Sequence, residues 1–241
     1  MRQDTQLQTG HILHARPYRD TSLLLEVFCR DHGRLGLVAR GARGPRARNR
    51  GLLQPFQPLL LSWSGRGELA NLHGVEAAGC AARLPGQALY AGFYLNELLL
   101  RLVPRLDPHP EVYTAYAEAL AGLGTEPQRP LRRFEKRLLE SLGYGLLLDH
   151  EAHSGAPVRA ESQYAYALES GPLPVDAAGA GGLILSGRSL LSLAADDLSD
   201  TQSLADAKRL MRAALGLYLG DRALKTREVF AASLGACRMW G

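Results

Sequence analysis

The feature that most constrains the fold is a change of hydrophobic period about one third of the way along the chain. Before residue 80, apolar residues come in short runs bounded by turn residues, which is typical of β-strands. Within residues 34–40, for example, Leu35, Leu37 and Ala39 share one face of an extended chain. The runs predict five strands, at residues 11–18, 21–29, 34–40, 52–65 and 68–76. Five short strands joined by tight turns predict a small closed or nearly closed barrel, although a small sandwich would show the same pattern.

After residue 86 the apolar residues recur every three or four positions, as they do on one face of a helix. The predicted helices cover residues 87–103, 111–123, 130–145, 187–195, 203–219 and 226–234. Residues 149–186 are rich in Gly and Pro and show weak periodicity, so we expect little regular structure there. The predicted fold is therefore a multi-domain α+β protein. A β domain at 1–80, a small barrel or sandwich by its pattern, is followed by an all-helical domain at 81–241, which carries the irregular insert at about 149–186.

Positive charge is concentrated in the first quarter of the chain. Residues 1–66 hold eleven Arg against four acidic residues, giving 11 − 4 = +7, whereas the whole chain carries only +4. A basic front region on a mildly acidic remainder suggests a surface that meets a polyanion. A genome biased toward Arg codons would explain the preference for Arg over Lys, but it would not explain the missing acids.

The densest basic segment is GARGPRARNRG, residues 41–51, between the third and fourth predicted strands. A guanidinium group meets phosphate oxygens with two donors in a fixed geometry. Because Gly and Pro interrupt this loop, we expect it to hold its arginines extended and away from the core. The predicted DNA-binding residues are Arg34, Arg40, Arg43, Arg46, Arg48 and Arg50. The rings that could stack on bases are Tyr18, Phe28, Phe56 and Trp63, although core packing is the more common role of large aromatics in a small domain.

Enzyme, metal and membrane signatures are weak in this sequence. The glycines near residue 41 are not followed by the Gly-Lys-Ser/Thr of a P-loop, and the pair Asp196-Asp197 sits in a polar run. His150 and His153 are spaced like half of a zinc site, but a second pair of ligands is missing, so we predict no metal, no cofactor and no catalytic residue. Three scattered cysteines and an N-terminus without an apolar segment favour a reducing, cytoplasmic setting, associated with the nucleoid, and no membrane contact.

Several stretches together resemble the RecO family of bacterial recombination mediators along nearly the whole chain. They are GHILHARPYRDTSLLLEVFCRDHG, VARGARGPRARNRGLLQPF, FYLNELLLRLVP, LRRFEKRLLESLGYG and LKTREVF, in this order. The resemblance implies an N-terminal OB-fold, a helical domain, and binding to single- and double-stranded DNA with annealing of complementary strands. It also implies action with RecR and RecF in loading RecA onto DNA coated by single-strand-binding protein, without a nucleotide or a catalytic residue.

One departure from the family concerns zinc. Many members carry four zinc-binding cysteines in the insert that follows the LGY segment, whereas Asp149-His150-Glu151-Ala152-His153 stands where the first Cys pair would be. The missing cysteines agree with the prediction of no metal.

A second basic surface is predicted on the helix at 131–142. Arg132, Arg133 and Arg137 lie beside a Leu and Phe stripe, which would suit the acidic, hydrophobic-tipped tail of single-strand-binding protein. The alternative is a solvated basic face whose arginines form ordinary ion pairs with Glu135 and Glu140. For the whole chain, the alternatives are an OB-fold protein that binds RNA or the ribosome, and an enzyme whose site is assembled from scattered residues.

Overall fold

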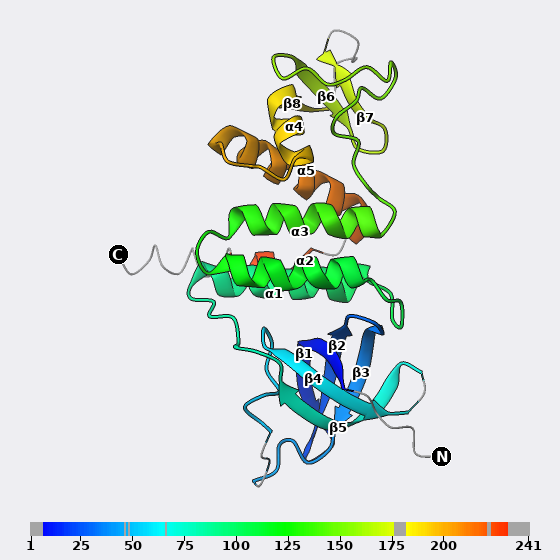
Figure 1. The fold of residues 1–241 in the computed structure, drawn as a ribbon, viewed down its shortest axis with the longest axis vertical. Coiled ribbons are helices and arrows are strands. Elements are labelled where there is room, and N and C mark those ends of the chain that lie inside the picture. Colours follow the sequence, from blue (N-terminus) through cyan, green and yellow to red (C-terminus); the bar gives the residue numbers. More distant parts are fainter. Residues whose placement is uncertain are drawn as a thin grey trace. The chain divides into compact units, whose positions relative to one another are not determined.

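Five strands form a closed barrel at the N-terminal end of the chain (Figure 1). The structure is a computed structural model that describes residues 7–45, 47, 49–65, 67–175, 182–220 and 223–230. The strands are β1 (Gln8–Tyr18), β2 (Ser22–Cys29), β3 (Gly33–Ala39), β4 (Pro58–Ser64) and β5 (Leu69–Ala77), in the order β1-β2-β3-β5-β4. Every neighbouring pair is antiparallel except β3 and β5, which close the barrel in parallel. The five-stranded barrel confirms the predicted fold class.

The barrel closes because alternate side chains of each strand point inward. Ile12, Leu25, Leu37 and Leu61 come from four different strands and are fully buried in one apolar cluster. The predicted fourth strand began too early, since residues 52–57 form turns rather than a ladder. Within this stretch, Pro55 lacks a backbone donor and Phe56 has a φ of 67°, so neither suits a central strand.

Helices α1 (Gln87–Leu102) and α2 (Pro110–Leu123) belong to the same compact unit as the barrel, which runs to Thr125 and resumes at Ala223. Buried hydrogen bonds link the two helices to strand β1. Asn96 donates to the carbonyl oxygen of Leu13 on β1 at 2.8 Å, and the Tyr116 hydroxyl of α2 donates to Asn96 at 2.6 Å. Because these buried polar groups satisfy one another, the barrel and its helices are held in one arrangement.

The segment 223–230 also belongs to this unit, and residues 225–230 are helical. Glu97 of α1 accepts hydrogen bonds from the backbone N–H groups of Lys225 and Thr226, both at 2.9 Å. Burial works to raise the pKa of Glu97, but the bonds from Thr226 and Lys225 hold it below its ordinary value. The described part of the predicted helix 226–234 is thus confirmed, and residues 231–234 lie outside the described residues.

The second unit spans Glu126–Arg222 and is mostly helical. It contains α3 (Gln128–Ser141), α4 (Gly187–Ala194) and α5 (Thr201–Leu219), each within a few residues of its predicted range. It also contains a three-stranded sheet, ordered β7-β6-β8, formed by β6 (Gln163–Ala167), β7 (Gly171–Pro174) and β8 (Leu183–Ser186).

The sheet corrects two expectations, a helical domain without strands and an insert with little regular structure. Its strands are four or five residues long, too short for periodicity to stand out among Gly and Pro. The alternation Tyr164-Ala165-Tyr166 was the available signal, and all three residues are buried. None of the described helices in either unit is long and apolar enough to cross a membrane.

Candidate nucleic-acid interface

The arginine-rich segment leaves β3 and folds back on the barrel. Gly41, at a φ of 69°, turns the chain out of the strand, and Ala42 is buried in the barrel core. Successive turns follow, in which Gly44 N–H donates to the Gly41 carbonyl at 3.0 Å and Ala47 N–H to Gly44 at 3.1 Å. The described arginines of the segment lie free of the core as expected, since Arg43 and Arg50 are exposed, but Ala42 anchors the start of the loop in the barrel core.

Arg43 ties this segment to the β1–β2 turn. Its backbone N–H donates to the Thr21 carbonyl at 2.8 Å, and its Nη1 lies 3.4 Å from the carbonyl oxygens of both Arg19 and Asp20. The side chain is exposed, so the remaining guanidinium donors face solvent. Arg43 therefore both fixes the turn and offers positive charge.

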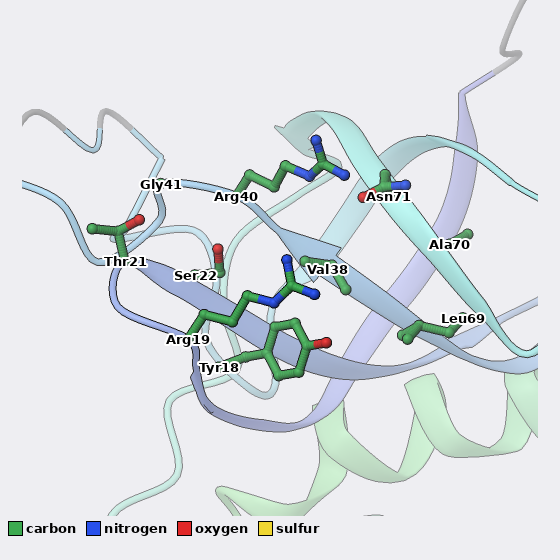
Figure 2. Close-up of a pocket in the computed structure, with 10 residues that line it drawn as sticks. All are labelled: Tyr18, Arg19, Thr21, Ser22, Val38, Arg40, Gly41, Leu69, Ala70 and Asn71. Atoms are coloured by element: carbon green, nitrogen blue, oxygen red, sulfur yellow. The ribbon is translucent and has the colours of Figure 1, made fainter.

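A hollow of about 480 Å³ opens on the outside of the barrel between these elements (Figure 2). Its walls come from the β1–β2 turn, the end of β3 and the start of β5. The lining residues are Tyr18, Arg19, Thr21, Ser22, Val38, Arg40, Gly41, Leu69, Ala70 and Asn71. In OB-folds, the β2–β3 face and the loops after β1 and β4 are the usual nucleic-acid-binding region, and this hollow lies in that region.

A second, smaller hollow of about 140 Å³ lies beside the first and shares Arg40 and Gly41 with it. Asn49 and Arg50 of the arginine-rich segment and His73 of β5 also line it. Arg19, Arg40 and Arg50 are all exposed, and no Asp or Glu is among the described residues that line either hollow. The two hollows and Arg43 form what we call the basic barrel face, where a polyanion would meet guanidinium groups without competing carboxylates.

The structure brings only part of the predicted DNA-binding set to this face. Arg40, Arg43 and Arg50 lie there, whereas Arg46 and Arg48 lie outside the described residues. Arg34, at the opposite end of β3, pairs with Glu26 at 3.3 Å and donates to the Val103 carbonyl at 3.0 Å.

Arg34 is thus engaged within the protein rather than offered to a ligand. Arg105 binds the other oxygen of Glu26, so the carboxylate is shared by two cations. Burial lowers the pKa of Arg34, and the charge of Glu26 opposes that shift.

Of the four candidate rings, only Tyr18 lines a hollow of the basic barrel face. Phe28 and Phe56 are buried, and Trp63 packs against the barrel core with its ring perpendicular to that of His32. Sequence reasoning missed Arg19, Leu69 and Asn71. The available signal was the position of Arg19 in the loop between the first two strands, which borders the binding face in OB-folds.

The predicted basic surface of α3 has a different environment. Arg132 is buried and pairs at 2.9 Å with Glu135, whose side chain is fully buried. Arg133 Nε donates to the Asp196 carbonyl at 2.8 Å, and Arg137 Nη2 lies 3.0 Å from the Asp196 carboxylate. Lys136, which was not predicted as a site residue, also binds Asp196.

Lys136 caps the end of α4. Its Nζ donates to the carbonyls of Leu193 and Ala194, at 2.9 and 2.8 Å, and to Asp196 Oδ1 at 2.8 Å. The last carbonyls of a helix have no partner within the helix, and a cation there also complements the helix dipole. The cationic side chains of α3 therefore bind groups within the second unit. This agrees better with the alternative of ordinary ion pairs than with a basic surface that is free to bind a partner.

The candidate metal ligands do not assemble. His150 lies 3.1 Å from its neighbour Asp149, and the described residues contain no cluster of three or more His, Cys, Asp or Glu that could hold a metal ion.

Comparisons with known proteins all identify the same family. A family model described as Recombination protein O N terminal matches residues 1–80, and one described as Recombination protein O C terminal matches residues 83–228. The chain is 52% identical over 227 residues to the DNA repair protein RecO of Alkalilimnicola ehrlichii, covering 93% of this chain and 90% of that protein. It is 49% identical over 227 residues to the protein of the same name from Azoarcus sp., covering 92% and 93%. The resemblance inferred from the sequence motifs is confirmed.

Proposed function

The chain belongs to the Recombination protein O family, and from that premise we propose that it is a DNA-binding mediator of recombinational repair. Membership supports a role in recombinational DNA repair. The finer activities that we propose are binding of single- and double-stranded DNA, annealing of complementary strands, and help in loading recombinase onto DNA coated by single-strand-binding protein. We propose that none of these involves catalysis, a metal or another cofactor.

The observation that carries the proposal is the basic barrel face. Arg40 lines both hollows, Arg50 and Arg19 line one each, and Arg43 follows two residues after Gly41, which lines both. Each is exposed, and carboxylates are missing from the described lining. Phosphate contacts of this kind supply affinity and orientation but read no sequence, as a protein that acts on any broken chromosome requires.

Annealing follows from the same electrostatics. Two complementary strands repel each other through their phosphates, and cations that neutralise both lower this repulsion while the base edges stay free to pair. Arg46 and Arg48, which belong to the same segment, would add to this effect. The RNA-binding alternative uses the same chemistry, so an RNA strand of matched sequence belongs in every assay.

The test is the salt dependence of binding to a single-stranded oligonucleotide. In a variant with Arg40, Arg46, Arg48 and Arg50 changed to Ala, the slope of log affinity against log salt should fall by about three units, because each lost contact on a single strand removes about 0.7. Arg43 is retained because it fixes the β1–β2 turn. The free energy of unfolding should change by less than about 1 kcal/mol, since Arg40 and Arg50 are exposed and form no structural bond among the described residues.

A matched control removes the same charge from the second unit. Arg159, Arg188, Lys208 and Arg212 are exposed, and changing them to Ala also lowers the net charge by four. This variant should keep the wild-type slope and the wild-type rate of strand annealing. If both variants lose the same slope, DNA is held by diffuse charge and the basic barrel face is not the site.

We further propose that the partners are RecR and the RecF and RecA pathway, with a cytoplasmic, nucleoid-associated location. For the acidic tail of single-strand-binding protein, we propose α3 with a narrower set of residues than predicted. Arg132 is buried, which leaves Arg133 and Arg137 at the surface, where Asp196 already binds them. An acidic peptide would therefore have to displace Asp196. A tail peptide that binds an Asp196→Asn variant no more tightly than wild type would reject this site.

A further inference from the structure

Arg19, in the β1–β2 turn, adopts a backbone conformation that costs energy for a residue with a side chain. Its φ is 51°, in the left-handed region that Gly or Asn occupies more easily. The bonds from Arg43 to the carbonyls of Arg19, Asp20 and Thr21 hold the turn in this form. A side chain kept at a position that suits Gly suggests that the side chain itself has a use.

The Arg19 guanidinium lies over the ring of Tyr18. Its Cζ atom is 5.3 Å from the ring centroid, within the range of a cation–π interaction. Figure 2 shows the guanidinium between the Tyr18 ring and Val38, below Arg40. Tyr18 and Arg19 both line the larger hollow, so this pair presents a ring and a planar cation to anything that enters it.

The remaining walls suit a flat, partly polar ring. Val38 and Leu69 supply apolar surface, and 49% of Leu69 is exposed, so its side chain is accessible to a ligand in the hollow. Asn71 offers both a donor and an acceptor, and Arg40 stands at the rim with its positive charge. The described lining contains no carboxylate that would repel a phosphate.

We propose that this hollow binds one unstacked base of a single nucleic-acid strand. The base stacks on the planar cation of Arg19, which the Tyr18 ring supports, and its edge meets Asn71 while the adjoining phosphate meets Arg40. Guanidinium planes and aromatic rings are the usual platforms for splayed bases. The inference rests on the proposed DNA-binding function and adds a contact that a paired, stacked duplex cannot make.

This base pocket would divide the basic barrel face into two parts. Arg50 and its segment neutralise phosphates of any strand, whereas the larger hollow selects single strands and fixes one nucleotide in register. Because only one base is held, the remaining bases of the strand stay free to pair.

The experiment compares a thymidine oligonucleotide with a fully abasic strand of equal length and equal charge, by fluorescence anisotropy at fixed salt. Wild type should bind the thymidine strand about 5- to 100-fold more tightly, the range expected for one stacked base. In Arg19→Lys the charge remains but the planar platform is lost, so this preference should fall at least several-fold with the salt slope unchanged. Leu69→Ala, which shortens the apolar wall, should lower the preference in the same direction.

Arg16→Lys is the matched control, since Arg16 is an exposed arginine of β1 that lines neither hollow. It should keep the wild-type preference. Equal affinity of wild type for the two strands would overturn the base pocket while leaving the phosphate-binding function in place. A preference that survives in Arg19→Lys and Leu69→Ala would also overturn it. Failure of wild type to bind either strand would overturn the proposed function and the base pocket together.

Discussion

The basic barrel face and the basic face of α3 look alike in the sequence and differ in the structure. Both concentrate arginines within a dozen residues. On the barrel, Arg40 and Arg50 are exposed, and the described hollows around them contain no carboxylate. On α3, Glu135 pairs with Arg132, and Asp196 binds Lys136, Arg133 and Arg137. Arginines indicate an anionic ligand only where the fold brings no acid of its own to meet them.

The largest expected effect that would test this comparison is the loss of Arg132. Arg132→Ala removes the cation paired with a fully buried carboxylate, so we expect the free energy of unfolding to fall by about 3–5 kcal/mol. Replacing both partners with apolar residues, Arg132→Met with Glu135→Leu, should restore most of that loss. Urea unfolding followed by circular dichroism measures both. A loss below about 1 kcal/mol in Arg132→Ala would mean that this pair resembles an exposed ion pair, and the contrast with the barrel would weaken.

Acid should act on the unit that carries the basic barrel face through His11, which is buried on β1 against the rings of Tyr113 and Tyr116. Burial lowers the pKa of His11 from 6.5 to about 4. As the pH falls below 6.5, His11 therefore becomes protonated in the unfolded chain while it stays neutral in the folded protein. The stability linked to His11 is complete above pH 6.5 and is lost as the pH falls toward 4, by about 2 kcal/mol at pH 5.

The measurement is urea unfolding at pH 7.5 and pH 5 for wild type and His11→Phe, which keeps a ring in the site but cannot be protonated. The variant should lose about 2 kcal/mol less than wild type between the two pH values. Equal losses in the two proteins would show that His11 is not the group responsible.

The smallest expected effect is that of Asp196→Asn, which makes the α3 face more like the barrel face. Asn tolerates the left-handed backbone at this position, where φ is 56°. Its amide oxygen can still accept from the buried Lys136, which also keeps the Leu193 and Ala194 carbonyls, so the cost to stability should be about 1 kcal/mol. Because Arg137 loses a competing carboxylate, while Arg133 keeps its bond to the backbone carbonyl, an acidic tail peptide should bind several-fold more tightly. Isothermal titration calorimetry, with Asp197→Asn as the neighbouring control, measures the change.

The sequence predicted the barrel well because its first three strands are apolar-rich runs of seven or more residues that end at clear turns. It indicated Arg43 and Arg50 of the basic barrel face because four arginines stand in one segment without an acid, and DNA binding there stays a prediction. The sequence could not predict that Arg34 is engaged within the protein. Arg34 shares Glu26 with Arg105, which lies 71 positions further along the chain (105 − 34 = 71).

Arg132 is a different case, because Glu135 stands three residues away and the pairing was visible as an alternative. What periodicity could not reveal is that this pair lies inside the protein. Arg19 was missed for a related reason. Its role depends on a turn conformation and on Arg43, 24 residues away, which fixes that turn.

The parallel pairing of β3 with β5 has a consequence for how the protein folds. It joins Gly36 to Leu69 and two further residue pairs, and the arginine-rich segment lies within the stretch of chain that this pairing closes. Local hairpins such as β2–β3 form early, whereas a pairing across about thirty residues must first overcome the entropy of closing the loop. Closing entropy grows only slowly with length, by about 0.6 kcal/mol for each doubling. The segment can therefore gain or lose residues at little cost to the barrel, so its length and charge are free to change with the ligand while the scaffold stays the same.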